Sequence, residues 1–297
     1  MDPLKIDVIG DYMVDVYENF SCTRISPEVP VPVLQYGTSS KFLGGAANVA
    51  RNLAEFDGVS LRCHGVVGND ENGLWIKDQF MRLGIKDHTK ISEYNASITK
   101  RRLLANGHPI CRIDCDGGAE NYVADFRERP DAIIISDYGK GTFGCVSAAT
   151  LTASKAGAKV FVDPKSENFG IYTGAFCLKP NLKELEVATG NCSSIDEIVA
   201  TCKTLIDRHC IENVVVTLGA KGSLHVDRQS HTLVPVKNVA VYNLTGAGDT
   251  MLAALTVKIM KGAGWENALT YANACSAYVV TKDVTTFVPN DQLRKFE

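Results

Sequence analysis

The sequence predicts an α/β protein with a mostly parallel, doubly wound sheet flanked by helices and a small β-sheet lid. Short β-branched runs that end in polar residues or glycine alternate with segments whose apolar residues recur at helical spacing. Two stretches, about 14–39 and 96–114, break that alternation. No repeat or Pro/Gly/Ser linker divides the 297 residues, so we expect a single domain over 1–297.

The strands and helices are predicted in chain order from these patterns. Residues 6–9 form an apolar run closed by Gly10-Asp11, and Gly44-Gly45 opens a segment with helical periodicity. Further strands are expected at 132–136, 159–163 and 214–218, and further amphipathic helices at 195–206, 252–259 and 265–279. Because parallel strands end at one edge of a sheet, polar residues after these strands are expected to form the site.

The two irregular stretches predict the lid. Three prolines and alternating apolar residues in 14–39 suit edge strands. Residues 97–104 and 110–114 flank Asn106-Gly107, a pair typical of a tight hairpin turn. We expect these strands to form a small β-layer over the site. Its apolar face predicts a homodimer, in which a second copy covers Val31, Val33 and Leu103.

Composition excludes several classes of protein and partner. A formal charge of −3 gives no basic footprint for nucleic acid or an anionic membrane, so we expect neither as a partner. No apolar run reaches the length of a membrane span, and the N-terminus lacks a signal-peptide core. We therefore expect a cytoplasmic protein.

The ten cysteines support a reducing compartment, because no CxxC pair occurs among them. Most are expected to be buried free thiols. Cys111 and Cys115 share one strand face, where the alternatives are two packed thiols or a metal pair. No other histidine or cysteine cluster has the spacing of a zinc site.

The most specific chemistry lies at Thr245-Gly246-Ala247-Gly248-Asp249, directly before a helical pattern. Glycines and a helix N-terminus let backbone amides surround an anion, and a carboxylate there can take a proton from an attacking hydroxyl. The alternative is a capped helix start. A P-loop is excluded because Ile134 stands where its first glycine is required, and no GxGxxG spacing supports a dinucleotide-dependent oxidoreductase.

A second glycine motif, Gly44-Gly45-Ala46-Ala47-Asn48, lies about 200 residues earlier in the chain. The two motifs together resemble the two signatures of the ribokinase-like (PfkB) carbohydrate kinases. The resemblance covers essentially the whole chain. Residues 10–15, 26–33, 136–141 and 163–165 are similar to the kinase part of bacterial heptose-7-phosphate kinases of ADP-heptose synthesis. Those relatives often continue into an adenylyltransferase domain, so the resemblance implies a kinase here and a separate adenylyltransferase in the same pathway.

The resemblance implies the roles of the residues in both signatures. Asp249 corresponds to the general base on the sugar hydroxyl, and Gly246, Ala247 and Gly248 to the anion hole for the transferring phosphoryl group. On the sugar side, the corresponding residues are Asp15, Gly44, Gly45 and Asn48. The alternatives are a solvated loop carboxylate for Asp15 and an outward helix position for Asn48.

The resemblance also implies a site for ATP and Mg²⁺. Asn181 corresponds to a residue near the nucleotide phosphates, and Glu184 to one that acts on Mg²⁺ through water. Their spacing also fits a capping box, which is the alternative for Glu184. The remaining nucleotide-side positions are Thr217, Gly219, Gly222 and Asn273. For Asn273 the alternative is a hydrogen bond in helix packing.

A sugar that already carries a phosphate requires cations, and the sequence offers several. Strand alternation places Lys100 and Arg102 on one face and Arg101 on the other. We favour Lys140 and Lys165, which follow strand ends, and include Arg101 and Asp137 among the expected substrate-binding residues. Arg112 is a further candidate cation for the substrate phosphate. For each of these cations the alternative is a solvated surface charge.

One departure from the family pattern concerns the cation requirement. Asn243 stands where relatives usually carry aspartate before Thr-Gly-Ala-Gly-Asp, which puts any monovalent-cation dependence in doubt. The leading hypothesis is phosphorylation of the anomeric hydroxyl of a heptose 7-phosphate by ATP. The alternatives are a PfkB kinase for another sugar or sugar phosphate, and a non-catalytic sugar-sensing protein of the same fold.

Overall fold

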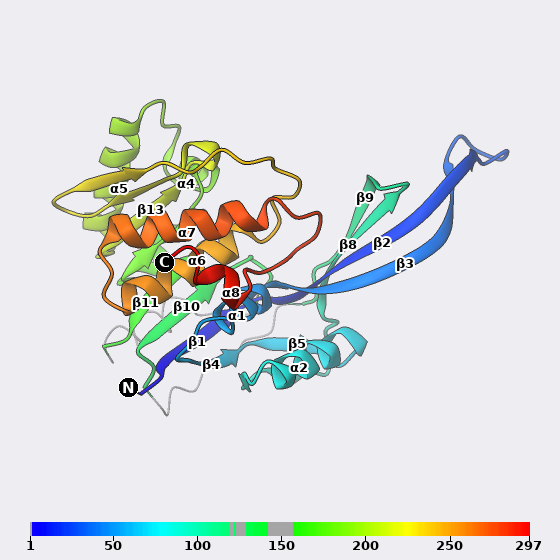
Figure 1. The fold of residues 1–297 in the computed structure, drawn as a ribbon, viewed down its shortest axis with the longest axis horizontal. Coiled ribbons are helices and arrows are strands. Elements are labelled where there is room, and N and C mark those ends of the chain that lie inside the picture. Colours follow the sequence, from blue (N-terminus) through cyan, green and yellow to red (C-terminus); the bar gives the residue numbers. More distant parts are fainter. Residues whose placement is uncertain (1, 119–121, 123–128, 142–156) are drawn as a thin grey trace.

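The computed structural model describes residues 2–118, 122, 129–141 and 157–297 (Figure 1). Its strands are β1 Leu4–Gly10, β2 Tyr12–Ile25, β3 Pro32–Gly45, β4 Val59–His64, β5 Val66–Gly68, β6 Lys86–Asp87, β7 Lys90–Ser92, β8 Ile98–Ala105, β9 His108–Cys115, β10 Ala132–Ser136, β11 Lys159–Asp163, β12 Cys177–Leu178, β13 Asn213–Thr217, β14 Ser223–Val226 and β15 His231–Val234. Its α-helices are α1 Ala46–Leu53, α2 Glu71–Arg82, α4 Leu182–Thr189, α5 Ile195–His209, α6 Ala247–Met260, α7 Trp265–Val279 and α8 Asn290–Leu293, with short 3-10 turns η1 Phe169–Tyr172 and η2 Gly219–Lys221.

The main sheet has nine strands in the order β15-β14-β13-β12-β11-β10-β1-β4-β6. Every pair from β13 to β6 is parallel, and β14 and β15 add an antiparallel edge. Gly10 of β1 lies in register with Ser136 of β10, which lies in register with Asp163 of β11. The residues that follow these three strands therefore meet at one edge of the sheet, as the sequence predicts.

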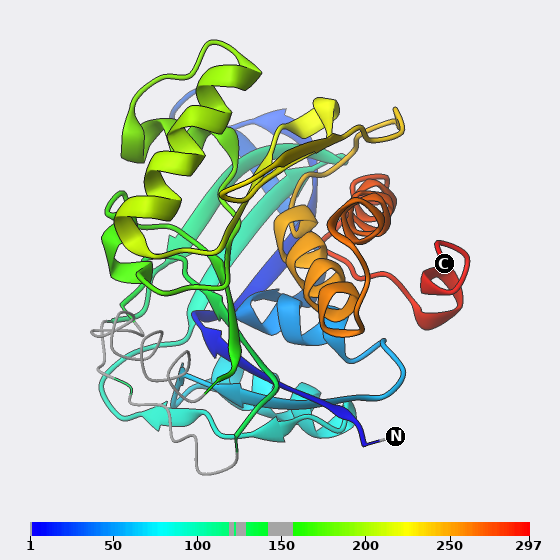
Figure 2. The same ribbon diagram turned by 90° about the vertical axis from the view of Figure 1, so that its left-hand side faces the viewer.

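Helices cover both faces of this sheet (Figure 2). Helices α1, α6 and α7 pack on one face, in the same apolar cluster as Ile6 and Val8. Helices α4 and α5 pack on the other face, with Ile9, Ile133 and Ile135. Each central strand sends alternate side chains to opposite layers, because both of its faces are buried. The doubly wound α/β architecture is confirmed.

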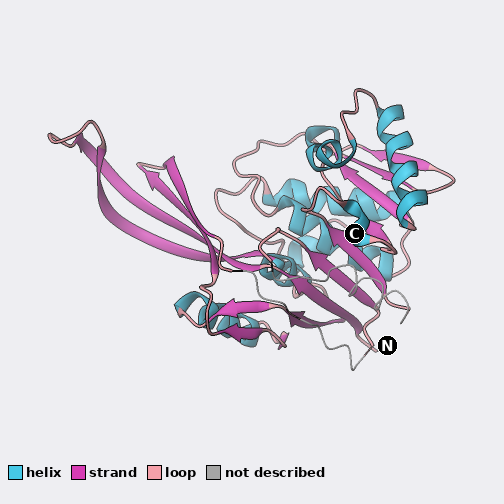
Figure 3. Ribbon diagram, turned by 180° about the vertical axis from the view of Figure 1, so that it is seen from behind, coloured by secondary structure: helices cyan, strands magenta, loops and turns pink. Residues whose placement is uncertain are grey.

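A second sheet, with the strand order β3-β2-β8-β9, projects from the α/β body (Figures 1 and 3). We call it the projecting sheet. Its strands extend over residues 12–45 and 98–115, further than the expected 14–39, because β2 begins directly after β1 and β3 runs into α1. Pro27 and Pro30 lie in the loop at its tip, and Pro32 begins the edge strand β3.

The cysteines differ from expectation. Those within the described residues are all free, but only Cys63, Cys177, Cys202 and Cys275 are buried. Cys111 and Cys115 are exposed on the edge strand β9, and Cys145 lies outside the described residues. Among the helices of the described residues, none is long and apolar enough to cross a membrane.

Gly10 brings β1, β10 and α1 together closely enough to exclude a side chain. A Cβ atom at this position would lie 2.3 Å from the carbonyl oxygen of Ser136 and 2.8 Å from Cβ of Ala46. Gly10→Ala should therefore lower the free energy of unfolding by about 1–3 kcal/mol, because backbone must move to relieve the overlap.

Urea denaturation of the variant and the parent measures this change. Gly264→Ala is the control for a general glycine effect, since nothing lies within 4 Å of a Cβ there and its φ of −67° suits alanine. Equal stability of Gly10→Ala and the parent would contradict the assigned close packing.

Candidate active site

The N-terminal turn of α6 carries a buried carboxylate, that of Asp249. Gly246 precedes the helix with φ 83°, and a Cβ atom there would lie 2.6 Å from Nδ2 of Asn48. Both the left-handed backbone and the lack of space therefore require glycine. Asp249 follows in the first helical turn and is 3% exposed. The helix N-terminus provides a favourable environment for an anion there.

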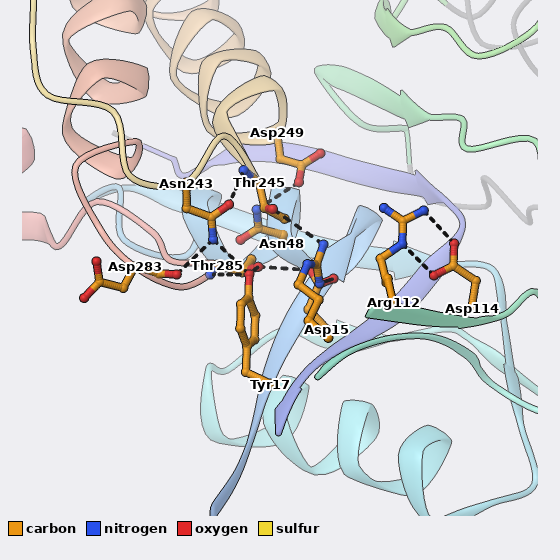
Figure 4. A network of polar contacts seen from close by, with 11 residues as sticks. Asp15, Tyr17, Asn48, Arg112, Asp114, Asn243, Thr245, Asp249, Asp283 and Thr285 are labelled. Atoms are coloured by element: carbon orange, nitrogen blue, oxygen red, sulfur yellow. Dashed lines mark hydrogen bonds and ion pairs between the residues drawn. The ribbon is translucent and has the colours of Figure 1, made fainter. Parts of the chain in front are cut away.

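Both oxygens of Asp249 accept hydrogen bonds from other elements. Nδ2 of Asn48 on α1 donates to Oδ2 at 2.9 Å, and the hydroxyl of Tyr138, after β10, donates to Oδ1 at 2.7 Å (Figure 4 shows the Asn48 contact). Burial raises the pKa of Asp249 above its ordinary value, while these two donors oppose the rise. The carboxylate is thus held in place and is more basic than one in water.

The loop after β10 is shaped by Asp11, which is 2% exposed. Its Oδ2 accepts hydrogen bonds from the backbone amides of Tyr138 at 2.9 Å and Lys140 at 3.2 Å. These bonds fix the backbone that presents the Tyr138 hydroxyl to Asp249. Asp11 therefore acts on the site through Tyr138.

Asp15, on β2, lies beside the same turn. Its Oδ1 accepts from Nη1 of Arg102 at 2.5 Å and its Oδ2 from Oγ1 of Thr285 at 3.2 Å (Figure 4). A Cβ at Gly44 would lie 2.7 Å from Oδ2 of Asp15, so this glycine leaves room for the carboxylate. Gly45 adopts φ 55° at the start of α1. Asp15 is 2% exposed, which contradicts the alternative of a solvated loop carboxylate.

Asn243 joins the loop before α6 to the projecting sheet (Figure 4). Its Nδ2 donates to the hydroxyl of Tyr17 at 2.9 Å and to the backbone oxygen of Asp283 at 3.1 Å. Its Oδ1 accepts from the backbone amide of Thr245 at 2.9 Å. The neutral amide donates to the backbone oxygen of Asp283, which the carboxylate of an aspartate at this position would repel.

A buried ion pair lies next to Gly248. Nζ of Lys179, after β12, is 3.1 Å from Oδ2 of Asp163 at the end of β11, and Lys179 is 3% exposed. A Cβ at Gly248 would lie 3.6 Å from each of these two charged atoms. Burial raises the pKa of Asp163 to about 6, against the lowering effect of Lys179.

The predicted nucleotide residues meet at one cavity of about 230 Å³. Thr217, Gly219 and Gly222 line it from the β13–β14 side, and Asn273 lines it from α7. Ala247 and Gly248 form its end nearest Asp249. Nδ2 of Asn273 also donates to the backbone oxygen of Val234 at 3.1 Å, so the helix-packing alternative holds together with the position at the cavity.

Asn181 and Glu184 form the capping box of α4. The side chain of each accepts from the other's backbone amide at 2.9 Å. Asn181 also forms a bridge with Thr217, which connects it to the cavity. The described residues contain no cluster of three or more acidic, histidine or cysteine side chains that could hold a metal. Glu184 and Asp163 instead suit a Mg²⁺ ion that is held mainly by phosphates and water.

Four predicted substrate residues lie apart from Asp249. Nζ of Lys140 pairs with Asp116 at 2.6 Å, and Nζ of Lys165 lies 3.6 Å from Glu184 on the nucleotide side. Asp137 accepts from the hydroxyl of Tyr172 and from the amide of Gly139. Arg101 points to the opposite face of the projecting sheet.

Arg101 pairs there with Glu18 at 2.8 Å and is about half exposed. The structure therefore gives no support to a substrate-binding role for Arg101. Lys100 and Arg102 are the β8 side chains on the Asp15 face, because β8 pairs with β2 in the register Asp15↔Lys100.

The sequence interpretation assigned no role to Tyr138, Asp163 or Lys179. Tyr138 and Lys179 follow strand ends and Asp163 ends a strand, the same signal that pointed to Lys140 and Lys165. Distinguishing adjacent residues in such loops requires the backbone path, which the loop's own hydrogen bonds determine.

Comparison with known proteins agrees with this architecture. The profile of the pfkB family carbohydrate kinases matches residues 4–292. Bifunctional protein HldE of Actinobacillus pleuropneumoniae serotype 5b is 35% identical over 298 residues, covering 97% of this chain and 62% of that protein. HldE of Coxiella burnetii is 32% identical over 300 residues, with 98% and 63% covered. The chain thus spans less than two thirds of these relatives.

Solved structures show the same fold at lower identity. Arabidopsis thaliana ribokinase, complexed with ribose and ATP, aligns with a TM-score of 0.81 and 19% identity, covering 100% of this chain and 99% of that one. Phosphofructokinase-2 of Escherichia coli, in complex with potassium, aligns with a TM-score of 0.79 and 19% identity, covering 100% and 98%. These likenesses confirm the ribokinase-like fold, and with the family profile over nearly its whole length the chain belongs to the pfkB family of carbohydrate kinases.

Proposed function

We propose that this sugar kinase uses ATP to phosphorylate the anomeric C1 hydroxyl of D-glycero-D-manno-heptose 7-phosphate, giving the 1,7-bisphosphate. The observation that carries the proposal is the position of Asp249, between Asp15 on one side and the nucleotide cavity on the other. The motifs similar to heptose-7-phosphate kinases and the 35% identity to HldE support the choice of sugar. A different sugar or sugar phosphate is the alternative, supported by the ribokinase and phosphofructokinase neighbours.

Asp249 is placed to act as the general base. The sugar hydroxyl gives its proton to the carboxylate while its oxygen attacks the γ-phosphorus of ATP, and the bond to the ADP oxygen breaks. The raised pKa makes Asp249 a better proton acceptor than an exposed aspartate. Tyr138 and Asn48 orient the carboxylate, and each of its oxygens retains a lone pair that can accept the proton of the hydroxyl.

The surrounding residues stabilise the charge that moves during transfer. Backbone amides at Gly248 and the positive end of α6 face the cavity, and Lys179 lies beside them. Glu184 and Asp163 would hold Mg²⁺ through water, and the bound ion would neutralise phosphate oxygens. Thr217 and the glycines of the β13–β14 turn allow the nucleotide to approach the backbone.

We further propose that the protein is a cytoplasmic homodimer and that a separate adenylyltransferase uses its product. The face of the projecting sheet opposite Asp15 exposes the apolar residues Ile113 and Tyr36 at 48% and 67%, and Val31 in the loop at the tip of the sheet is 48% exposed. Exposed patches of this kind mark interfaces, and a twofold pairing of two such sheets would cover them.

The substrate assignment is tested by ADP release with Mg·ATP across a panel of acceptors: D-glycero-D-manno-heptose 7-phosphate, sedoheptulose 7-phosphate, fructose 6-phosphate, ribose, fructose and adenosine. We expect turnover of the aldoheptose phosphate alone. Turnover of another acceptor instead would keep the mechanism and overturn the substrate. No ADP release with any of these acceptors would favour a non-catalytic protein.

Asp249→Asn serves as the control in that assay. It removes the proton acceptor but keeps the shape of the side chain, so kcat should fall about 10²- to 10⁴-fold while ATP still binds. Normal turnover by this variant would contradict the role of Asp249.

Tyr138→Phe tests the positioning of the base. Loss of its hydrogen bond removes a donor that favours the ionised carboxylate, so the pKa of Asp249 should rise further. Because activity falls as the pH drops through the pKa of the base, the acid limb of kcat/KM should move to higher pH. The measurement is kcat/KM against pH for the variant and the parent.

Tyr172→Phe is the matched control, because its hydroxyl bonds to Asp137 and not to Asp249. Its acid limb should remain where the parent's lies. A lower kcat for Tyr138→Phe with an unmoved limb would mean that Tyr138 only supports the loop.

The dimer is tested by sedimentation at micromolar concentration. We expect twice the mass of one chain, and Ile113→Lys should shift the equilibrium toward monomers because it places a charge on the apolar face. Asp196→Lys on α5, a charge change on an exposed residue of the α/β body, is the control. A monomeric parent would refute the proposal.

A further inference from the structure

One side-chain amide joins three segments of the chain around the start of α6 (Figure 4). Nδ2 of Asn243 donates to the hydroxyl of Tyr17 on β2 and to the backbone oxygen of Asp283, in the loop after α7. Its Oδ1 accepts from the backbone amide of Thr245, the residue before Gly246. Asn243 therefore connects the projecting sheet, the loop after α7 and the glycine turn of the site.

Backbone groups determine which way this amide points. The amide of Thr245 can only donate and the carbonyl of Asp283 can only accept, so the side-chain oxygen must face the first and the nitrogen the second. The two loops are also joined directly. The backbone amides of Tyr242 and Asn243 donate to the backbone oxygen of Val280 at 2.8 and 3.3 Å. The amide thus lies in a fixed backbone frame.

From this amide a series of hydrogen bonds leads to Asp15. The Tyr17 hydroxyl accepts from Asn243 and, at 3.2 Å, from the backbone amide of Thr285. Its own proton can then point to Oγ1 of Thr285 at 3.1 Å, and that hydroxyl donates to Oδ2 of Asp15 at 3.2 Å. Tyr17, Thr285 and Asp15 are all buried, so each polar atom requires a partner. Protein donors supply these partners.

A carboxylate at position 243 would reverse this pattern. An ionised carboxylate only accepts, so it would face the backbone oxygen of Asp283 without a donor between them. The hydroxyl oxygens of Tyr17 and Thr285 lie beside this contact. A cluster that contains a carboxylate, a carbonyl and hydroxyls, all of them oxygen ligands, is the environment that hard cations prefer. The aspartate usual in relatives would therefore favour a bound cation here.

We propose that the Asn243 amide takes the place of a monovalent cation in this kinase, so that neither its folding stability nor its turnover depends on K⁺. The residues present do not fit such an ion, because the N–H groups of Asn243 point at the oxygens of Asp283 and Tyr17 that would have to coordinate it. An ion would have to displace both hydrogen bonds.

In this position Asn243 acts on the site through its neighbours. Thr245 leads directly into the turn that carries Asp249, and Tyr17 leads through Thr285 to Asp15. Asn243 is therefore a positioning residue that holds the base side and the sugar side of the site in register. The part of the inference that concerns turnover rests on the proposed function, whereas the part that concerns stability does not.

The test compares the parent with Asn243→Asp in KCl and in tetramethylammonium chloride, whose cation is too large for such a cluster, at equal ionic strength. Thermal unfolding is measured without an acceptor, and ADP release is measured with Mg·ATP and D-glycero-D-manno-heptose 7-phosphate. For the parent, the unfolding midpoint should agree within about 1 °C and kcat/KM within about twofold between the two salts.

For Asn243→Asp, we expect K⁺ to matter in both measurements. A cation that binds only the folded variant should raise its unfolding midpoint by about 2–5 °C. The value of kcat/KM should be about tenfold or more higher in KCl, because without the ion the carboxylate repels the backbone oxygen of Asp283 and displaces the glycine turn.

Asn191→Asp is the matched control, since it makes the same substitution at an exposed residue after α4. It should respond to the two salts as the parent does. A parent that loses turnover or stability without K⁺ would overturn the inference, as would an Asn243→Asp variant that is indifferent to K⁺ in both measurements. If Asn243→Asp fails to fold in either salt, the response of the parent decides. If the parent phosphorylates no acceptor, the proposed function fails, while thermal unfolding still tests the role of Asn243.

Discussion

The buried carboxylate of Asp249 is the constraint on which the rest of the site depends. A charge that is 3% exposed is stable only if donors surround it, and here they come from three separate elements. The N-terminal turn of α6, Asn48 on α1 and the Tyr138 hydroxyl after β10 must all be in place. The close contact of β1, β10 and α1 at Gly10 sets the spacing between two of them.

Around that carboxylate the charges alternate in sign across the edge of the sheet. Lys179 lies between Asp163 and the N-terminal turn of α6, while Arg102 lies between Asp15 and Thr245. Burial raises the pKa values of both Asp163 and Asp249, and the charge of Asp249 raises that of Asp163 further. Bound phosphates and a divalent cation would relieve these unfavourable charge interactions, which is consistent with electrostatic preorganisation.

Local sequence patterns predicted the order of strands and helices and the position of Asp249. They did not predict which strands pair in the projecting sheet or which side chains share a face. The glycine-rich helix start located Asp249, because that feature depends on neighbouring residues. The resemblance to the family's motifs assigned Asn48 and the nucleotide residues. Short strands such as β6 and β12 have two residues each and no detectable period. The sequence-based prediction included Arg101 and not Arg102, because the sequence alone does not show how β2 pairs with β8. Only that register shows which residues share a face with Asp15.

The register of β8 against β2 therefore determines which side chains of the projecting sheet face the site and which face away from it. A slip of β8 by one residue would turn Arg101 toward the site. It would also turn the cations Lys100 and Arg102 to the face that exposes apolar groups such as Ile113. The hairpin turn prevents this slip: Asn106 and Gly107 adopt φ 51° and 81°, and the Asn106 side chain bonds to the backbone of Cys22 at 2.9 and 3.2 Å. A turn remote from Asp249 thus fixes which charges face the substrate.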